Sequence, residues 1–321
     1  MPLNCERLEK TVTSLNSLKP GIVFFGNERL ATGVTTNAPV LRALIKDGYP
    51  IEAVIVNHEQ ATSRKQRILE VEELAFTHNI PILAPDTKEA LVSIVDNLTS
   101  PIAVLAAYGR IIPGSVIDHF SFGILNIHPS ALPKYRGSTP IESVMLDGLE
   151  STAVSLMQLD VKMDAGAVYA QTDSKLSGLV SKQSLADQLG AVGAKMILET
   201  LPLILDGKIT AHPQDESQAT YTKQITKQDG NLDLSKPAKV LEREIRAYAG
   251  WPGSSTIISD KPIIVTTAGV LNVSGEPGTY FTHEKQLAVY CGQNALIITR
   301  LKPAGKNDMS SRDFLAGNPI N

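Results

Sequence analysis

Short runs of consecutive apolar residues alternate with longer amphipathic or charged segments through the first half of the chain. The apolar runs lie at 21–26, 51–56, 80–84, 102–107 and 122–128. Runs of this kind predict strands buried on both faces, and helical spacing is found between them near 38–45, 64–78 and 87–97. The alternation therefore predicts an α/β fold in which a Rossmann-like, mostly parallel sheet is covered by helices.

Three further segments complete this part of the chain. The residues at 152–159 and 167–174 alternate with a period of two, which predicts antiparallel strands added to the sheet. A long helical pattern follows at 182–205. The next residues, 206–218, are polar and rich in turn formers, which indicates a domain boundary.

The chain changes character beyond that boundary. We expect a helix at 236–248, with Ser235 as its N-cap and Pro237 near its first position. Short strands with turn residues between them follow at 255–259, 261–266, 285–292 and 294–301. They predict a small β-barrel. The expected organisation is an N-terminal extension at 1–19, a first domain at 20–206, a linker at 207–220 and a second domain at 221–321.

Composition indicates the cellular compartment of the protein and the classes of ligand that it can bind. The 321 residues carry a formal net charge of −3, so binding a polyanion would need a local basic surface. Cys5 and Cys291 lack the spacing of metal ligands or of a disulfide framework. Residues 1–20 lack the apolar stretch of a signal peptide, and nowhere do about 18 apolar residues run together. We expect a cytoplasmic monomer with no metal and no membrane association.

The stretch LNIHPSALPKYRG at 125–137 places two polar side chains in an apolar strand. Asn126 and His128 are two residues apart, so both face the same side of the strand. Pro129 has no N–H and ends the ladder, which puts the pair at the carboxyl end of a strand, where α/β sheets bind ligands. Taken singly, the histidine could be structural and the asparagine could simply stabilise a turn.

A carboxylate for the same site is expected from the loop LDVKMDAGAVYAQ at 159–171, which holds Asp160 and Asp164. An aspartate near His128 would orient the ring and favour its protonated form. Amide, imidazole and carboxylate together could perform acyl transfer without a covalent nucleophile. The nucleophile-elbow pattern GxSxG is absent from the sequence, in agreement with this.

Four stretches resemble successive motifs of the folate-dependent formyltransferases: IVFFGNERLA, AAYGRIIPGSVID, LNIHPSALPKYRGSTPIESVMLDG and MQLDVKMDAGAVYAQ. This family includes enzymes that act on methionyl-tRNA, glycinamide ribonucleotide and amino sugars, and a hydrolase of 10-formyltetrahydrofolate. Its Asn–x–His pair and its aspartate in an Asp–x–Gly context match Asn126, His128 and Asp164. The resemblance implies that Asn126 and a protonated His128 stabilise a tetrahedral oxyanion, while Asp164 helps to move the proton of the attacking amine.

The second half is similar to the carboxyl-terminal, OB-like domain of the members that formylate methionyl-tRNA. The similarity lies in ATYTKQITKQDGNLDL, EREIRAYAGWPGSS and ITRLKPAGKNDMSSRDFLAGNP. It implies transfer of the formyl group of 10-formyltetrahydrofolate to the α-amino group of methionyl-tRNA. The alternatives are an amino-sugar nucleotide formyltransferase, a formyltetrahydrofolate hydrolase that uses water as acceptor, and a tRNA-binding protein without catalysis.

The resemblance also implies binding residues. The residues expected to bind folate flank the pterin pocket of the family, and they are Tyr108, Arg110, Ile112, Leu159, Asp160 and Met163. For Ile112 and Met163, packing in the core is an equal alternative. Members that act on tRNA carry a basic insertion after the second strand, and here a shorter segment offers Arg64, Lys65 and Arg67. Phosphate contacts in the second domain are expected from Lys223, Lys227, Arg243, Arg246, Arg300, Lys302, Lys306 and Arg312.

Overall fold

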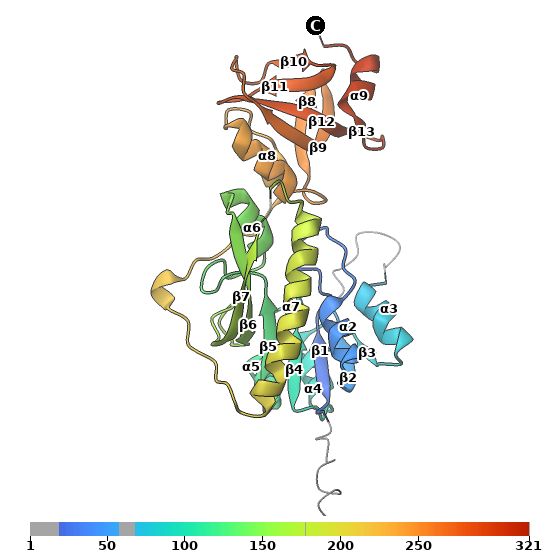
Figure 1. Cartoon of the computed structure of the whole chain (residues 1–321). Helices are drawn as coiled ribbons and strands as arrows, with labels where there is room; N and C mark the ends of the chain where they lie inside the picture. The colour runs from blue at the N-terminus through green and yellow to red at the C-terminus, as the bar shows by residue number, and fades with distance from the viewer. Residues whose placement is uncertain (1–18, 58–67, 177, 321) are drawn as a thin grey trace, which may run out of the picture.

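The computed structural model describes residues 19–57, 68–176 and 178–320, which form two β-sheets with associated helices (Figure 1). The first sheet has seven strands in the order β3-β2-β1-β4-β5-β6-β7. Their bounds are β1 Ile22–Phe25, β2 Ile51–Ile55, β3 Ile82–Leu83, β4 Ile102–Leu105, β5 Ile124–His128, β6 Ser151–Gln158 and β7 Val168–Lys175. Strands β1 to β5 are parallel, whereas β6 and β7 are antiparallel to their neighbours, as the sequence predicts.

Helices cover both faces of this sheet. They are α2 Pro39–Lys46, α3 Glu70–Thr77, α4 Lys88–Val95, α5 Gly114–His119, α6 Pro140–Asp147 and α7 Lys182–Leu205. Adjacent residues of β1 show the two layers, since Phe24 packs in the core formed with α2, α3 and α7, and Phe25 in the core formed with α4 and α5. Helices α5 and α6 were not predicted, because each is short and follows a proline-containing loop.

Helix α7 lies in the protein core. Among the described residues it is the one helix whose length and hydropathy could suit a membrane span, although half of that stretch is buried inside the protein. It packs against α2, β6 and β7. Gly193 brings it so close to β5 that an added Cβ would lie 2.7 Å from Ile127. Its apolar composition is therefore explained by burial within the protein.

The second sheet is antiparallel, with the order β10-β11-β12-β9-β8, and β13 pairs with β12. The elements are α8 Ala238–Ala247, β8 Ser254–Ile258, β9 Lys261–Leu271, β10 Tyr280–His283, β11 Gln286–Tyr290, β12 Ala295–Pro303, β13 Met309–Ser310 and α9 Ser311–Gly317. A hydroxyl hydrogen bond of 2.7 Å between Thr256 and Tyr280 links the two outer strands. This curled sheet agrees with the predicted β-domain, although β10, β13 and α9 were not predicted.

The predicted N-cap of α8 is wrong. The helix begins at Ala238 after Pro237, whose backbone is extended (φ −58°, ψ 140°). Ser235 lies in a preceding turn, where its hydroxyl donates to Asp233 Oδ1 at 2.6 Å. The N–H of Ala238 instead donates to the carbonyl of Gln293 at 2.9 Å, so a distant segment satisfies the helix terminus.

A buried ion pair lies where the two parts of the molecule meet. Lys182 Nζ and Glu142 Oε1 are 3.8 Å apart, and their side chains are 2% and 1% exposed. Burial raises the pKa of Glu142 and lowers the pKa of Lys182, while each charge favours the ionised form of the other. Glu142 also accepts from Thr32 N at 3.0 Å, and Lys182 donates to Trp251 O at 3.5 Å. The pair thereby joins α6, α7 and the turn after α8.

Breaking this pair should destabilise the protein strongly. We expect Lys182→Met to lower the free energy of unfolding by about 3 kcal/mol, because it leaves a buried carboxylate without its cation. The double variant Lys182→Met/Glu142→Gln should recover most of that loss, since the amide oxygen can still accept from Thr32. Urea unfolding of both variants measures this, and equal losses in the two would contradict it.

A second buried carboxylate should make stability depend on pH. Glu28 accepts from Val40 N and Leu41 N at 2.8 Å each, yet desolvation by burial raises its pKa from 4.5 to about 7. Between these values the folded state binds a proton that the unfolded state does not, so stability falls as pH rises through this window.

We therefore expect the unfolding free energy of the wild type to fall relative to that of Glu28→Gln between pH 5 and 7. The limiting slope is about 1.4 kcal/mol per pH unit. Urea titrations of both proteins at four pH values test it. A difference between them that does not change with pH would contradict the argument.

Candidate active site

The end of β5 carries the first two predicted site residues. Asn126 and His128 are 6% and 5% exposed and pair with Met157 and Ser155 of β6. Their spacing of two turns both side chains toward one face, and the strand ends at His128 directly before Pro129. The amide and the imidazole therefore lie at the carboxyl end of a central strand, as predicted.

Asp164 joins them from the loop between β6 and β7. Its Oδ2 accepts a hydrogen bond of 2.7 Å from Gly137 N and lies 3.8 Å from His128 Nδ1. Its Oδ1 accepts from Asn126 Nδ2 at 3.4 Å. The backbone of Asp164 is left-handed, with φ of 48°, a conformation that aspartate tolerates better than most residues. The structure thus brings together the three predicted side chains.

The tautomer of His128 follows from its other contact. Its Nε2 lies 3.0 Å from the carbonyl oxygen of Tyr135, which can only accept, so Nε2 carries a hydrogen and donates. Nδ1 then faces the carboxylate of Asp164. Asn126 uses one hydrogen of its amide on Asp164, which leaves the second for a ligand. The group can present hydrogen-bond donors to a developing negative charge beside a carboxylate that can take up a proton.

The predicted folate residues lie in two adjacent loops. Tyr108 and Ile112 are buried in one core, and Leu159 packs against it. Val161 comes within 3.4 Å of the position that a Cβ on Gly114 would take, so the two loops touch. Arg110 donates to Pro85 O at 2.7 Å. Of the two residues for which core packing was an alternative, Ile112 is buried and Met163 is 58% exposed. Asp160 is also exposed, and its Oδ1 accepts from Lys162 N.

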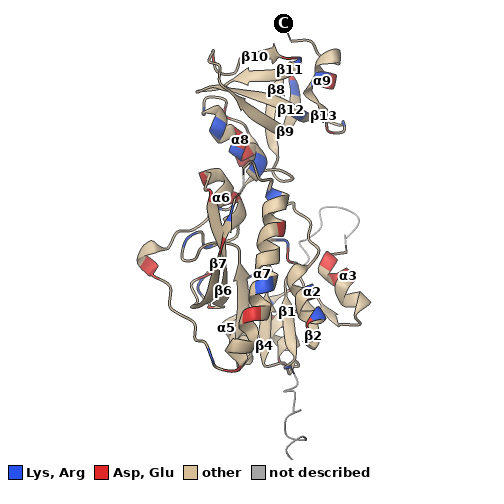
Figure 2. Ribbon diagram, in the orientation of Figure 1, with Lys and Arg blue, Asp and Glu red and all other residues tan. Residues whose placement is uncertain are grey.

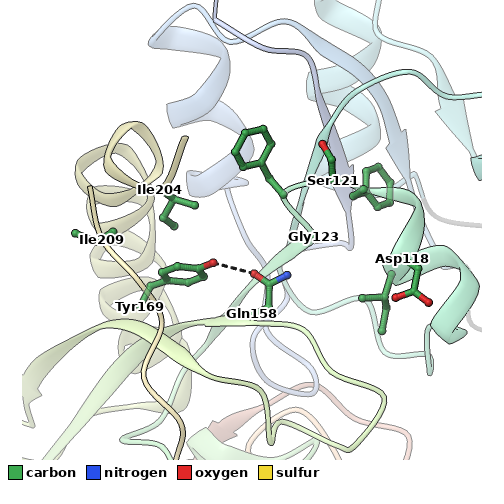
Figure 3. A pocket seen from close by; sticks show the side chains of 10 residues that line it. Asp118, Ser121, Gly123, Gln158, Tyr169, Ile204 and Ile209 are labelled. Carbon is green, nitrogen blue, oxygen red and sulfur yellow. Dashed lines mark hydrogen bonds between the residues drawn. The ribbon is translucent and has the colours of Figure 1, made fainter. Parts of the chain in front are cut away.

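One cavity lies at the first of these loops, and a second lies at the start of β5. One of about 230 Å³ is lined in part by Tyr108, Arg110 and Leu91. The other, of about 480 Å³, opens between α5, the start of β5 and the end of α7 (Figure 3). In it the Tyr169 hydroxyl donates to Gln158 Oε1 at 3.1 Å. The lining of neither cavity includes Asn126, His128 or Asp164.

The predicted tRNA residues are scattered over the second part of the chain, and Arg64, Lys65 and Arg67 lie outside the described residues. Arg246 Nε donates to Glu242 Oε1 at 2.6 Å, and Arg246 Nη1 donates to the carbonyl oxygen of Val180 at 2.9 Å. Arg300 is paired with Asp308. Lys223, Lys227, Lys302, Lys306 and Arg312 are exposed, and Arg243 is half-buried. Figure 2 shows lysine and arginine along α8 with acidic residues between them.

Two residues that the sequence analysis did not single out complete the surroundings of the site. The Arg136 side chain is fully buried, and its guanidinium donates to both Gln214 and Glu216. Gln214 in turn donates to the carbonyl oxygens of Asp164 and Gly166 at 2.8 and 2.7 Å. Arg136 lies within the KYRG motif, which was a usable signal, whereas Gln214 lies in a polar segment that resembles an ordinary linker.

Comparisons with known proteins show the family of the chain. The model of the family "Formyl transferase" matches residues 30–201, and the model "Formyl transferase, C-terminal domain" matches residues 224–319. The methionyl-tRNA formyltransferase of Methylococcus capsulatus is 35% identical over 92% of this chain and 96% of its own length. That of Bacillus licheniformis is 34% identical over 92% of this chain and 94% of its own length.

Solved structures share the fold at lower identity. HypX from Aquifex aeolicus in complex with tetrahydrofolic acid has a TM-score of 0.64 at 16% identity, covering 93% of this chain and 47% of that one. WlaRD, a sugar 3N-formyl transferase, has a TM-score of 0.65 at 17% identity, covering 90% and 99%. By its two matched domains and its curated relatives, the chain is an enzyme of formyl-group transfer and belongs to the methionyl-tRNA formyltransferase family.

Proposed function

We propose that the protein transfers the formyl group of 10-formyltetrahydrofolate to the α-amino group of methionyl-tRNA, giving the formylated initiator for translation. The observation that carries this proposal is the convergence of Asn126, His128 and Asp164 through contacts shorter than 4 Å at the end of β5. The names of the relatives support the acceptor, and the HypX complex with tetrahydrofolic acid supports a folate as the donor.

The proposed reaction needs no covalent intermediate on the protein. The neutral amine of methionine attacks the formyl carbon, a C–N bond forms, and the carbonyl electrons move to oxygen. Asn126 Nδ2 and the Nδ1–H of a protonated His128 donate to this oxyanion, while His128 Nε2 stays bonded to the Tyr135 carbonyl. Asp164 accepts a proton from the attacking amine, directly or through water, and the proton passes to N10 as the C–N10 bond breaks. Tetrahydrofolate and the formamide of methionyl-tRNA are the products.

We assign the folate donor to the adjacent loops that carry Tyr108, Arg110, Ile112, Leu159, Asp160 and Met163. Support comes from the contact between these loops and from their position beside Asp164. Exposed Met163 lies one residue before Asp164, where a bound cofactor could cover it. We also propose that residues 20–206 form the catalytic domain, 207–220 a linker and 221–321 an OB-like domain that binds tRNA.

Loss of either donor should reduce turnover without unfolding the protein. We expect Asn126→Ala and His128→Ala to lower kcat about a hundredfold or more, because each removes a preorganised group that acts on the oxyanion. The assay follows N-formylmethionyl ester formed from purified protein, methionyl-tRNA and 10-formyltetrahydrofolate. Asn97→Ala, which changes an amide just beyond the end of α4, is the matched control. Near-normal rates in the two site variants would remove the assignment.

The same assay distinguishes the alternative acceptors. Formate released in the absence of any amine acceptor would support the hydrolase alternative. Formyl transfer to an amino-sugar nucleotide, with none to charged tRNA, would support the sugar enzyme.

Binding of tRNA should weaken steeply with salt, because lysine contacts to phosphates release condensed counterions. We expect log Kd for tRNA to rise linearly with log salt concentration. Lys302→Gln/Lys306→Gln should lower that slope by about two. Filter binding at five salt concentrations measures it. Lys195→Gln on α7, where the lysine is 77% exposed, is the control and should leave the slope unchanged. A Kd for the wild type that is independent of salt would overturn the phosphate contacts.

A further inference from the structure

The segment that connects α7 with α8 makes hydrogen bonds to the loops of the candidate active site. We call residues 212–223 the strap. In Figure 1 this segment rises from the lower end of α7 past β6 and β7 toward α8. His212 pairs with Val168 at the start of β7 through two hydrogen bonds of 2.9 Å. Further along, the strap runs beside the loop that follows β5.

Backbone hydrogen bonds join the strap to that loop like a short pair of strands. Arg136 N donates to Thr220 O at 2.9 Å, and Thr222 N donates to Arg136 O at 2.8 Å. Tyr135 N donates to the hydroxyl of Thr220 at 2.9 Å. The strap therefore fixes the backbone on either side of two groups used in the site, the Tyr135 carbonyl that accepts from His128 and the Gly137 N–H that donates to Asp164.

Gln214 lies at the centre of this arrangement. Its Nε2 donates to the carbonyl oxygens of Asp164 and Gly166 at 2.8 and 2.7 Å. Its Oε1 accepts from Nε and from a terminal nitrogen of Arg136 at 3.1 and 2.8 Å. Both hydrogens and both lone pairs of the amide are thus in use, and the guanidinium on one side and the carbonyls on the other fix its orientation.

The turn that Gln214 holds is the one that presents the Asp164 carboxylate. Asp164 has a left-handed backbone, and a Cβ on Gly166 would lie 1.8 Å from the carbonyl oxygen of Gln158. The turn is therefore pressed against β6 on one side and hydrogen-bonded to Gln214 on the other. Without the amide, no other described side chain donates to these two carbonyls.

We infer that Gln214 is a positioning residue for formyl transfer, which acts through the Asp164 turn and ties the catalytic carboxylate to the buried Arg136. This inference rests on the proposed function, because its effect is measured on that reaction. A displacement of about 1 Å in a reacting group can cost up to a hundredfold in rate. The hydrogen bonds of the Gln214 amide are all made within the protein, so we expect binding of folate and tRNA not to depend on it.

The variant Gln214→Glu removes the hydrogen bonds that the amide donates and keeps those that it accepts. The carboxylate can still accept from Arg136, which keeps the strap attached, but it cannot donate to the carbonyls of Asp164 and Gly166 and repels them. Gln218→Glu is the matched control, since it makes the same charge change on an exposed side chain of the same strap. Gln214→Met is a second variant, which loses both the donated and the accepted hydrogen bonds.

We expect Gln214→Glu to lower kcat for methionyl-tRNA formylation at least tenfold. Its KM values for 10-formyltetrahydrofolate and methionyl-tRNA, and its melting temperature, should stay near those of Gln218→Glu. Gln214→Met should lose kcat as well. A kcat for Gln214→Glu within twofold of Gln218→Glu, or a loss confined to KM, would overturn the inference while leaving the proposed function intact. A wild-type protein that forms no formylmethionyl-tRNA would instead overturn the proposed function.

Discussion

The carboxylate of Asp164 ties its own turn to β5 and to the loop that follows β5. It accepts from Gly137 N in the loop after β5, accepts from Asn126 within β5, and faces His128 at the end of that strand. Gly137 permits this contact, because its φ of 113° suits glycine and a Cβ there would lie 2.5 Å from the Thr222 hydroxyl. The amide and the imidazole both lie beside this carboxylate.

These groups suit charge development because they are largely buried. The side chains of His128 and Asp164 are 6% and 15% exposed, so water screens them less than it would on an open surface. Donors held rigidly in such surroundings stabilise an oxyanion without having to reorganise during the reaction. The rigidity comes from the packed sheet and from the strap, each of which satisfies backbone groups that the loops would otherwise leave unpaired.

The strap also connects the part of the enzyme that carries the first sheet with the part that carries the second sheet. It begins against β7, crosses the loop after β5, and leads through residues 224–237 into α8. The buried pair of Glu142 and Lys182 makes a second connection, between α6, α7 and the turn at Trp251. The part of the chain that carries the second sheet is thus joined to the same backbone that holds Asp164 and His128.

The sequence by itself determined the parallel sheet, its antiparallel extension and α7, because these depend on the periodicity of apolar residues. It also placed Asn126 and His128 at the carboxyl end of a strand, because a proline follows them. Spacing alone left Asp160 and Asp164 both as candidates, the resemblance to the family pointed to Asp164, and the tertiary structure shows the contacts that distinguish the two. Asp164 reaches Gly137, 27 positions away, whereas the side chain of Asp160 accepts from Lys162 in its own exposed turn. Arg136 and Gln214 were missed for the same reason, since they lie 78 residues apart and a charged or amide side chain is expected at the surface until the fold buries it. Local patterns specify elements, while hydrogen bonds across long stretches of chain assemble the site.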